Sequence, residues 1–445
     1  MINSVKNFVS ELWPYRARLG VYLASFIVIE VLFSLLLFAK NAAAAETFAR
    51  SFVVAFLASS GLIIFGFYTK NVNISFLFSL LLLLGVVLIC INEPVAADAS
   101  FLESIRDAEH IIVAVIFTIT LSVSLRIISG RAFEKPLLIC AILCSINALI
   151  YSILFLFGND TYGVKVSFMG INLCEITKVI YIIALAYLFS DSQFSYITRL
   201  KASLAVLSIN CFALFLLSEL GTACIMMAVF LIAQLLFGQT KHTLIVFISF
   251  FLIMLLGILT VLWLHNRSSM PQIITDNIDK IYYRLFSSSS SYQMEKALLA
   301  SLNGGMLGAT DFNVDVPIIE SDFIVVALVQ RFGLVFFIAY IIGLSLILVM
   351  CCRAAYEKTE QEYNNSMMFV FAMLGLFSVI IQSICSILMA FNCFPIIGIC
   401  NPLIDAHGSN LMVTSGIIVC VLQGLNRSGR SEKGEKREKI HRIKN

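Results

Sequence analysis

The segment "PIIESDFIVVALVQRFG", residues 317–333, places two acids directly before a long apolar run. Glu320 and Asp322 close a polar region, and the chain then stays predominantly apolar to residue 351. About 20 mostly apolar residues suffice for a helix to cross the hydrocarbon core of a bilayer. One interpretation of the acids is a helix N-terminus, where negative charge suits the helix macrodipole. The other is that one of them does chemistry at a membrane surface.

The amino-acid composition indicates whether this chain is surrounded by water or by lipid. Its 445 residues are 60% hydrophobic and 13% charged, whereas soluble domains are roughly 45–50% apolar and about 25% charged. A soluble protein could not cover this much apolar surface with polar groups. We therefore expect an all-α polytopic membrane protein. No basic stripe interleaved with aromatics occurs, so no nucleic-acid partner is expected.

Twelve segments are apolar and long enough to span a bilayer. They are residues 18–39, 51–69, 73–92, 110–128, 136–157, 172–190, 200–217, 220–238, 243–264, 323–351, 366–391 and 408–425. The sequence thus predicts a bundle of about 10–12 transmembrane helices.

The distribution of charge predicts the orientation of these spans. If the N-terminus is cytoplasmic, most Lys and Arg residues fall in inside loops, and the tail 426–445 adds eight Lys/Arg against three Glu. Loop 93–109, which would lie outside, carries five acids and one arginine. By the positive-inside rule, both termini are cytoplasmic and the long loop 265–322 is extracytoplasmic. Loops this long are usually functional, and its "GGMLG" glycines allow tight turns or close backbone approach.

Several polar residues fall at the predicted outer ends of the spans. Glu175 and Lys178 are three residues apart, so a helix places them on one face. They form either a structural ion pair or part of a groove for an anionic group. Glu219, in "SELGT", is a helix cap or a ligand, and Ser409 lies in "PLIDAHGSN" at the mouth of the last span. Their common side favours an outward-facing polar site.

The twelve cysteines lie almost all within apolar runs and include no CxxC pair. They are interpreted as small core hydrophobes. For Cys393 and Cys400 a disulfide is the alternative interpretation, since both residues fall in one predicted outer loop.

Five of these stretches follow one another in an order typical of a known family. They are "NLCEITK" (172–178), "SELGT" (218–222), "SYQMEKALLASLNGGMLG" (291–308), "PIIESDFIVVALVQRFG" (317–333) and "QSICSILMAFNCFPIIGICNPLIDAHGS" (382–409). The set resembles the SEDS family (shape, elongation, division and sporulation), the FtsW/RodA/SpoVE-like peptidoglycan polymerases, over roughly residues 165–427. The chain looks like a divergent member, because Gln330 and Arg331 stand where the family has paired glutamates.

The resemblance implies a division of the chain into three parts. Residues 1–72 would be two additional N-terminal transmembrane helices, 73–427 a SEDS-like transmembrane core, and 428–445 a basic cytoplasmic tail. It also implies a multi-pass protein of the bacterial cytoplasmic (inner) membrane.

The function implied is that of a peptidoglycan glycosyltransferase, which polymerises lipid II at the outer face of the membrane. The acceptor hydroxyl is a poor nucleophile, and the retained acid Asp322 would be its general base. The resemblance places Glu175, Lys178, Glu219, Gln293 and Ser409 at the substrate. The departing pyrophosphate needs positive charge, from Lys178 or from a divalent cation, Mg or Mn. A class B penicillin-binding protein, a transpeptidase, and membrane lipids would be the partners.

Three other functions remain open. A lipid-linked precursor flippase or transporter would also have twelve spans, although such carriers usually show matching internal repeats, which we do not find. Another membrane glycan enzyme, such as an O-antigen polymerase or ligase, would share the large outer loop. A catalytically weak scaffold for division or sporulation would fit the replacement of the glutamate pair by Gln330 and Arg331.

Overall fold

The computed structural model describes most of the chain. It covers residues 16–40, 42–92, 101–129, 136–161, 164–168, 170–190, 194–265, 278–279, 281–283, 292–308, 314–319, 321–361, 366–405 and 408–426. Almost all of the described elements are helices, which confirms the predicted all-α polytopic membrane fold. Glu320, His407 and the basic tail from residue 428 lie outside the described residues.

The helices follow the predicted spans closely. Their bounds are α2 (Arg16–Lys40), α3 (Ala42–Tyr68), α4 (Val72–Asn92), α5 (Phe101–Ile128), α6 (Pro136–Phe157), α7 (Leu173–Ser190), α8 (Tyr196–Leu216), α9 (Leu220–Phe237), α10 (Thr240–His265), α12 (Tyr292–Gly304), α13 (Ile324–Gln361), α14 (Met367–Ala390) and α15 (Gly408–Gly424). Within the described residues, nine are long and apolar enough to cross a membrane, and shorter apolar helices occupy the other three predicted positions.

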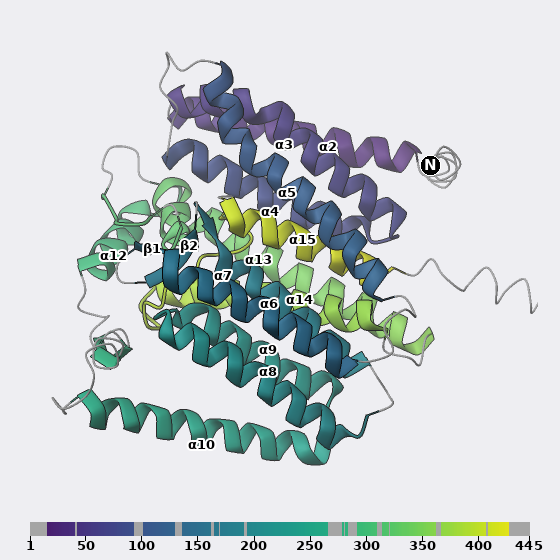
Figure 1. The fold of residues 1–445 in the computed structure, drawn as a ribbon. Helices are drawn as coiled ribbons and strands as arrows, with labels where there is room; N and C mark the ends of the chain where they lie inside the picture. The colour runs from purple at the N-terminus through teal and green to yellow at the C-terminus, as the bar shows by residue number, and fades with distance from the viewer. Residues whose placement is uncertain are drawn as a thin grey trace, which may run out of the picture.

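The helices form a layered bundle with an additional hairpin at one edge (Figure 1). The hairpin of α2 and α3 packs against α4, and α7, α9, α14 and α15 pack together at the centre. The strands and α12 lie at one end of the bundle, and the Arg16 end of α2 lies at the opposite end (Figure 1). Which end faces the cytoplasm stays a prediction from the charge pattern.

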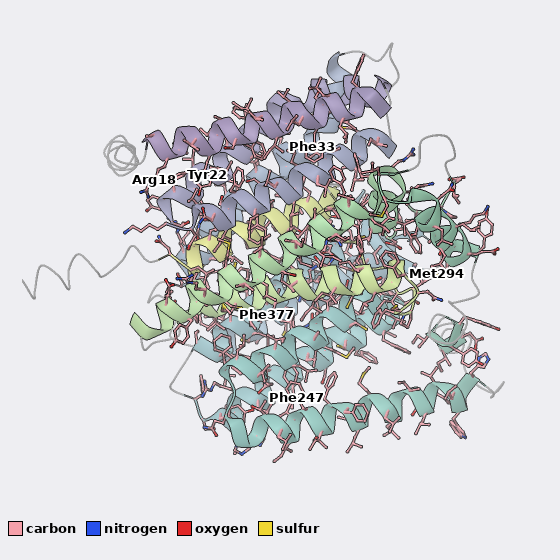
Figure 2. All side chains as sticks on the ribbon, turned by 180° about the vertical axis from the view of Figure 1, so that it is seen from behind. Arg18, Tyr22, Phe33, Phe247, Met294 and Phe377 are labelled. Atoms are coloured by element: carbon pink, nitrogen blue, oxygen red, sulfur yellow. The ribbon has the colours of Figure 1, made fainter. Side chains whose placement is uncertain are left out.

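Helix α10 is the most exposed of the predicted spans. It runs along the far edge of the bundle from the α2–α3 hairpin and contacts mainly α9. Large apolar side chains along it, Phe251, Leu256 and Trp263 among them, are more than half exposed, and Phe247 marks this helix in Figure 2. Such a surface suits surrounding lipid, since hydrocarbon solvates apolar side chains as well as a protein core does.

A small sheet was not predicted. Strands β1 (Asn159–Thr161), β2 (Val164–Phe168) and β3 (Ile171–Asn172) form an antiparallel sheet in the order β1-β2-β3 between α6 and α7. Their pairing satisfies backbone groups of a connection too short to show a clear alternation of polar and apolar residues. Strand β3 leads directly into α7 and so fixes where that helix begins.

The apolar run after Asp322 is not one uninterrupted helix. Gly333 has φ +81° and interrupts the helical backbone of α13. The nine residues before it, 324–332, are buried except for half-buried Arg331, so this segment belongs to the core rather than to the lipid face. The stretch of α13 that is long and apolar enough to cross a membrane, Ile324–Lys358, extends on both sides of Gly333.

A glycine of the "GGMLG" stretch permits close contact with this interrupted helix. A Cβ added at Gly304 would lie 2.1 Å from the Val329 carbonyl oxygen, and one at Gly333 would lie 2.3 Å from that of Met306. The Leu334 amide donates to the Gly305 carbonyl at 3.0 Å. The "GGMLG" part of the long loop is thus packed backbone to backbone against α13, and the loop also contains helix α12, which sequence analysis did not predict.

Candidate functional site

A buried ion pair lies in the first turns of α7. The Lys178 ammonium is 2.5 Å from the Glu175 carboxylate, and the two residues are only 2% and 9% exposed. The i, i+3 spacing on a helix brings them together, as predicted from the sequence. Charges buried this deeply are retained only when they are paired and hydrogen-bonded, so each of the two side chains depends on the other.

Gln382 of α14 joins this pair to the loop between α14 and α15. Lys178 Nζ donates to Gln382 Oε1, and Gln382 Nε2 donates to the Cys400 carbonyl at 3.1 Å. Gln382 is 3% exposed. Its amide accepts a hydrogen bond from the cation and donates one to the backbone, which couples α7, α14 and the loop between α14 and α15 through a single side chain.

The same loop residue contacts the predicted catalytic acid. The Cys400 thiol donates to Asp322 Oδ1 at 3.5 Å. Burial raises the pKa of this thiol well above its usual range, and the neighbouring carboxylates of Asp322, Asp405 and Glu175 raise it further. Cys400 therefore remains a protonated donor to Asp322, and a continuous series of contacts connects Glu175 and Lys178 with Asp322. Cys393 and Cys400 are both free thiols.

Asp322 lies where the long loop meets α13 and is half-buried. On its other side is Gly398, at φ +68°, where an added Cβ would lie 3.8 Å from Asp322 Oδ2. The glycine permits a backbone conformation that other residues rarely adopt. It also keeps a side chain away from this oxygen.

Buried polar side chains hold the rest of the loop. Asn401 Oδ1 accepts from the Tyr340 hydroxyl at 2.8 Å. Asn410 Nδ2 donates to Asp405 Oδ2 at 3.1 Å and to the Asn401 carbonyl at 3.3 Å. All four residues are at most 6% exposed. Because α13, α15 and the loop are connected in this way, the backbone that carries Cys400 is fixed relative to Asp322.

Glu219 is observed as a helix cap next to the same loop. Its Oε1 accepts from the Thr222 amide at 3.2 Å and from the Thr222 hydroxyl at 3.0 Å, at the start of α9. A Cβ at the neighbouring Gly221 would lie 2.8 Å from the Ile397 carbonyl. The first turn of α9 therefore packs directly beneath the loop, and capping is one role of Glu219.

Ser409 and Gln293 occupy different surroundings. Ser409 Oγ accepts from the Asn172 amide at 3.0 Å, which ties the start of α15 to strand β3 just before α7. Gln293 is partly buried in the first turn of α12, which packs against α13. Among the described contacts, none links Gln293 to the residues around Asp322.

The departure from the expected glutamate pair also has a local explanation. Gln330 is 1% exposed, and its Nε2 donates to the Val314 carbonyl at 3.1 Å. An amide can donate this bond, whereas an ionised carboxylate can only accept. Gln330 thus holds the end of the long loop 265–322 against the buried part of α13.

Sequence analysis missed part of this arrangement. Cys400 and Gln382 connect the predicted residues, and Asp405 and Asn401 brace the loop, but none was chosen as a site residue. The available signal was the density of polar residues between 400 and 410. In the described part of the chain, no three His, Cys, Asp or Glu side chains are grouped in a way that would hold a metal cation.

The fold and the site define a multi-pass membrane protein with a polar network at one end of its bundle. The chain matches the sequence model of the FtsW/RodA/SpoVE family, described as cell cycle proteins, over residues 70–428. The chain therefore belongs to this family, and it is a multi-pass protein of the bacterial inner membrane. A search of curated protein sequences gave no match.

Two solved structures share the fold. One is described by the words "Structural coordination of polymerization and crosslinking by a peptidoglycan synthase complex". The present chain is 14% identical to it, and the two superpose with a TM-score of 0.60. The other is a mutant of the rod shape determining protein RodA of Thermus thermophilus, 14% identical, with a TM-score of 0.51. Each match covers 80% of this chain and 98% of the other. Membership of the family gives the chain a role in peptidoglycan synthesis.

Proposed function

We propose that this protein is a glycosyltransferase that polymerises lipid II into glycan strands, with Asp322 as the general base. The observation that carries the proposal is the connected series from the Glu175–Lys178 pair through Gln382 and Cys400 to Asp322. A positioned carboxylate is the device that a weakly nucleophilic sugar hydroxyl requires. The solved neighbour described as coordinating polymerization and crosslinking supports this reaction class.

In the proposed reaction, Asp322 accepts the proton of the acceptor hydroxyl as its oxygen attacks the anomeric carbon of the donor sugar. The bond from that carbon to the pyrophosphate oxygen breaks, and the prenyl pyrophosphate leaves with the bonding electron pair. Cys400 donates to Oδ1 of Asp322, while glycine at position 398 keeps the space next to Oδ2 free of a side chain. The Cys400 thiol orients the carboxylate, and a correctly oriented base is more effective.

We propose that Lys178 positions the residues around Asp322 and does not contact the substrate. Its ammonium is buried against Glu175 and Gln382, so its charge fixes the amide that holds the Cys400 backbone. Glu219 stabilises the first turn of α9, and Ser409 stabilises the start of α15. Both of these helix ends contact the loop between α14 and α15. Gln293, on α12, is proposed to contact the part of the substrate outside the membrane.

The test is polymerisation of purified lipid II by the full-length protein, with a class B penicillin-binding protein supplied. Asp322→Asn and Asp322→Ala should lower the rate by about 10²–10⁴-fold, the usual contribution of a general base. Asp279→Asn is the matched control, because Asp279 is a partly exposed loop acid paired with His265 away from this network. Full activity in both Asp322 variants would overturn the assignment of the base.

We also propose a crosslinking transpeptidase of the penicillin-binding class as the partner. The neighbouring structure of a peptidoglycan synthase complex supports this choice. If the wild-type chain retains the partner on co-purification but makes no glycan, the protein is a scaffold in wall synthesis rather than a polymerase. The uncharged Gln330, where the family has a glutamate, is the observation that keeps this second function under test.

A further inference from the structure

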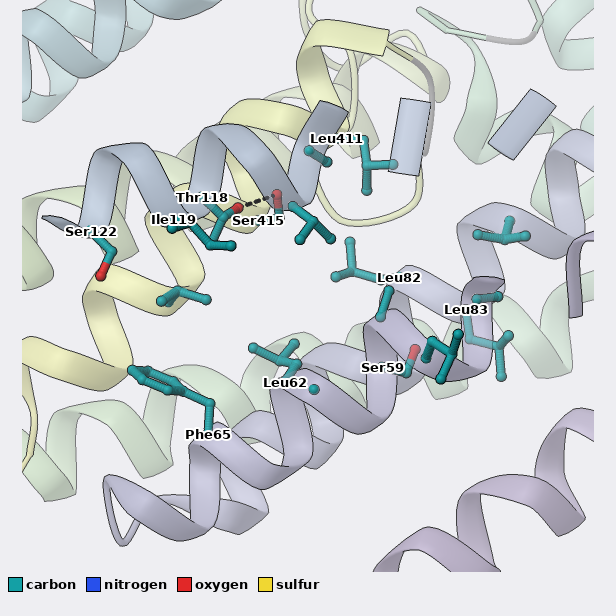
Figure 3. A pocket seen from close by; sticks show the side chains of 18 of the residues that line it. Ser59, Leu62, Phe65, Leu82, Leu83, Thr118, Ile119, Ser122, Leu411 and Ser415 are labelled. Carbon is teal, nitrogen blue, oxygen red and sulfur yellow. Dashed lines mark hydrogen bonds between the residues drawn. The ribbon is translucent and has the colours of Figure 1, made fainter. Parts of the chain in front are cut away.

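A cavity of about 440 Å³ lies within the bundle, away from the polar network. Its walls come from α3, α4, α5 and α15 (Figure 3). The volume falls within the roughly 300–1,000 Å³ of small-molecule sites. The family match begins at residue 70, so the α3 wall, from Ala55 to Phe65, belongs to the additional N-terminal hairpin.

The cavity is closed at its floor and open at its side. Floor residues Leu83, Ala114 and Leu411 are 1–6% exposed. Leu57 of α3 and Ile119 of α5, which also line it, are 62% and 59% exposed. The opening therefore lies between α3 and α5 on the outer surface of the membrane-crossing helices, where the surrounding medium is lipid.

The lining suits a hydrocarbon chain. Its surface is overwhelmingly apolar, although the buried Gln423 Oε1 has no hydrogen-bond partner in the described part of the chain. Thr118 Oγ1 and Ser415 Oγ are 3.0 Å apart (Figure 3), and Gln423 Nε2 donates to Ser122 Oγ. These hydroxyl groups need no polar ligand. A polar molecule would gain little here and would lose its own hydration.

The cavity is also long and narrow in the direction of the helices. The wall on α15 runs from Leu411 to Gln423, thirteen residues separated by twelve rises of about 1.5 Å, or roughly 18 Å. On α3, small residues leave the space: a Cβ built on Gly61 would meet no atom within 4 Å. An extended chain that lies parallel to the helices fills such a shape.

We propose that this cavity binds one acyl chain of a membrane phospholipid, which fills the space between the N-terminal hairpin and the core. A phospholipid is favoured over a lipid-linked sugar because α15 separates the cavity from the polar network. The cavity face of α15 carries Leu411 and Ser415, while its neighbours Ser409 and Asn410 contact β3 and the loop. A chain that enters from the side between α3 and α5 never meets Asp322. This proposal is independent of the catalytic one.

The test is native mass spectrometry of the full-length protein after extended detergent washing. The wild-type chain should retain one phospholipid, and Gly61→Phe should lose it, because the new ring fills the cavity. Gly257→Phe is the matched control: Gly257 also has no atom within 4 Å of an added Cβ, but it lies on exposed α10, so the bound lipid should remain.

A second measurement does not depend on any variant. Wild-type protein is loaded with phosphatidylethanolamine that carries a photoreactive diazirine in one acyl chain, washed, irradiated and mapped by peptide mass spectrometry. Crosslinks at the cavity walls on α3, α5 and α15 are expected. No retained lipid, retention unchanged by Gly61→Phe in a folded protein, or wall labelling only by a diazirine-bearing prenyl phosphate would each overturn the proposal.

Discussion

Asp322 and Glu320 are two residues apart, and the resemblance to the family motif singled out Asp322 as the predicted base. The structure adds a contact from a distant residue, because the thiol of Cys400, 78 residues further on, donates to Asp322. The pairing of Glu175 with Lys178 is a local consequence of helix geometry, and sequence analysis predicted it. The second partner of Lys178, Gln382, is 204 residues away. Local residue spacing is accessible from one sequence, whereas the partner that completes a network is not.

The buried ion pair leads to a prediction about stability. Lys178→Met should strongly destabilise the fold, by about 3–5 kcal/mol, because it leaves the Glu175 carboxylate buried without its cation. The double variant Glu175→Gln/Lys178→Met should recover much of this loss, since neither side chain is then charged. Thermal unfolding in detergent measures the effect.

The matched control for this cycle is the ion pair of Arg353 and Glu357, which is also within one helix but has side chains 80% and 31% exposed. Arg353→Met should change stability by less than about 1 kcal/mol, as expected for an exposed pair. Additive effects of the two substitutions at Glu175 and Lys178 would show that the pair is not coupled.

At the scale of elements, α13 shows how an apolar run is divided. Sequence analysis predicted one span over 323–351, and hydrophobicity alone does not distinguish a buried segment from a lipid-facing one. The structure interrupts the helix at Gly333, because the loop glycines pack against this point. Asp322 is thereby placed before a short buried segment, at the level of the polar network, instead of at the end of a single long helix.

Gly333→Ala tests this interruption. The substitution should destabilise the protein by more than about 1 kcal/mol, because alanine is strained at positive φ and its Cβ would lie 2.3 Å from the Met306 carbonyl. We also expect reduced lipid II polymerisation, since Asp322 moves with this segment. Gly257→Ala, where the added Cβ meets nothing within 4 Å and alanine favours the helix, should not lower the unfolding temperature or the activity. An equal effect of both substitutions would contradict the role of Gly333.

At the scale of the whole molecule, the α2–α3 hairpin lies before the part of the chain that matches the family. The family match begins at residue 70, between α3 and α4, while the division at residue 73 into separate parts stays a prediction. The hairpin buries Phe26, Leu37 and Ile63. The hairpin also buries Glu30 completely, and neither carboxylate oxygen has a hydrogen bond among the described residues. Burial of an acid without a partner costs free energy, so Glu30 weakens the packing of the hairpin against the rest of the bundle.

Removal of residues 1–69 should leave a folded core in a bilayer. In lipid, the uncovered face of α4 meets hydrocarbon, so little hydrophobic driving force is lost. In detergent, where the hairpin and its cavity no longer support α4 and α5, we expect a lower unfolding temperature. Size-exclusion elution and thermal unfolding in nanodiscs and in detergent compare the two cases. Aggregation in both would show that the hairpin is an integral part of the fold.

The sequence by itself determined the membrane location, the twelve apolar helices and the family, because length and hydrophobicity are local properties and the family motifs lie in order along the chain. It also determined the contact between Glu175 and Lys178, which helix geometry imposes. Only the tertiary structure decided which acids converge, where α13 is interrupted and where a lipid-sized cavity remains. These features depend on contacts between segments far apart in the sequence, and the packing of those segments is not written in any single stretch.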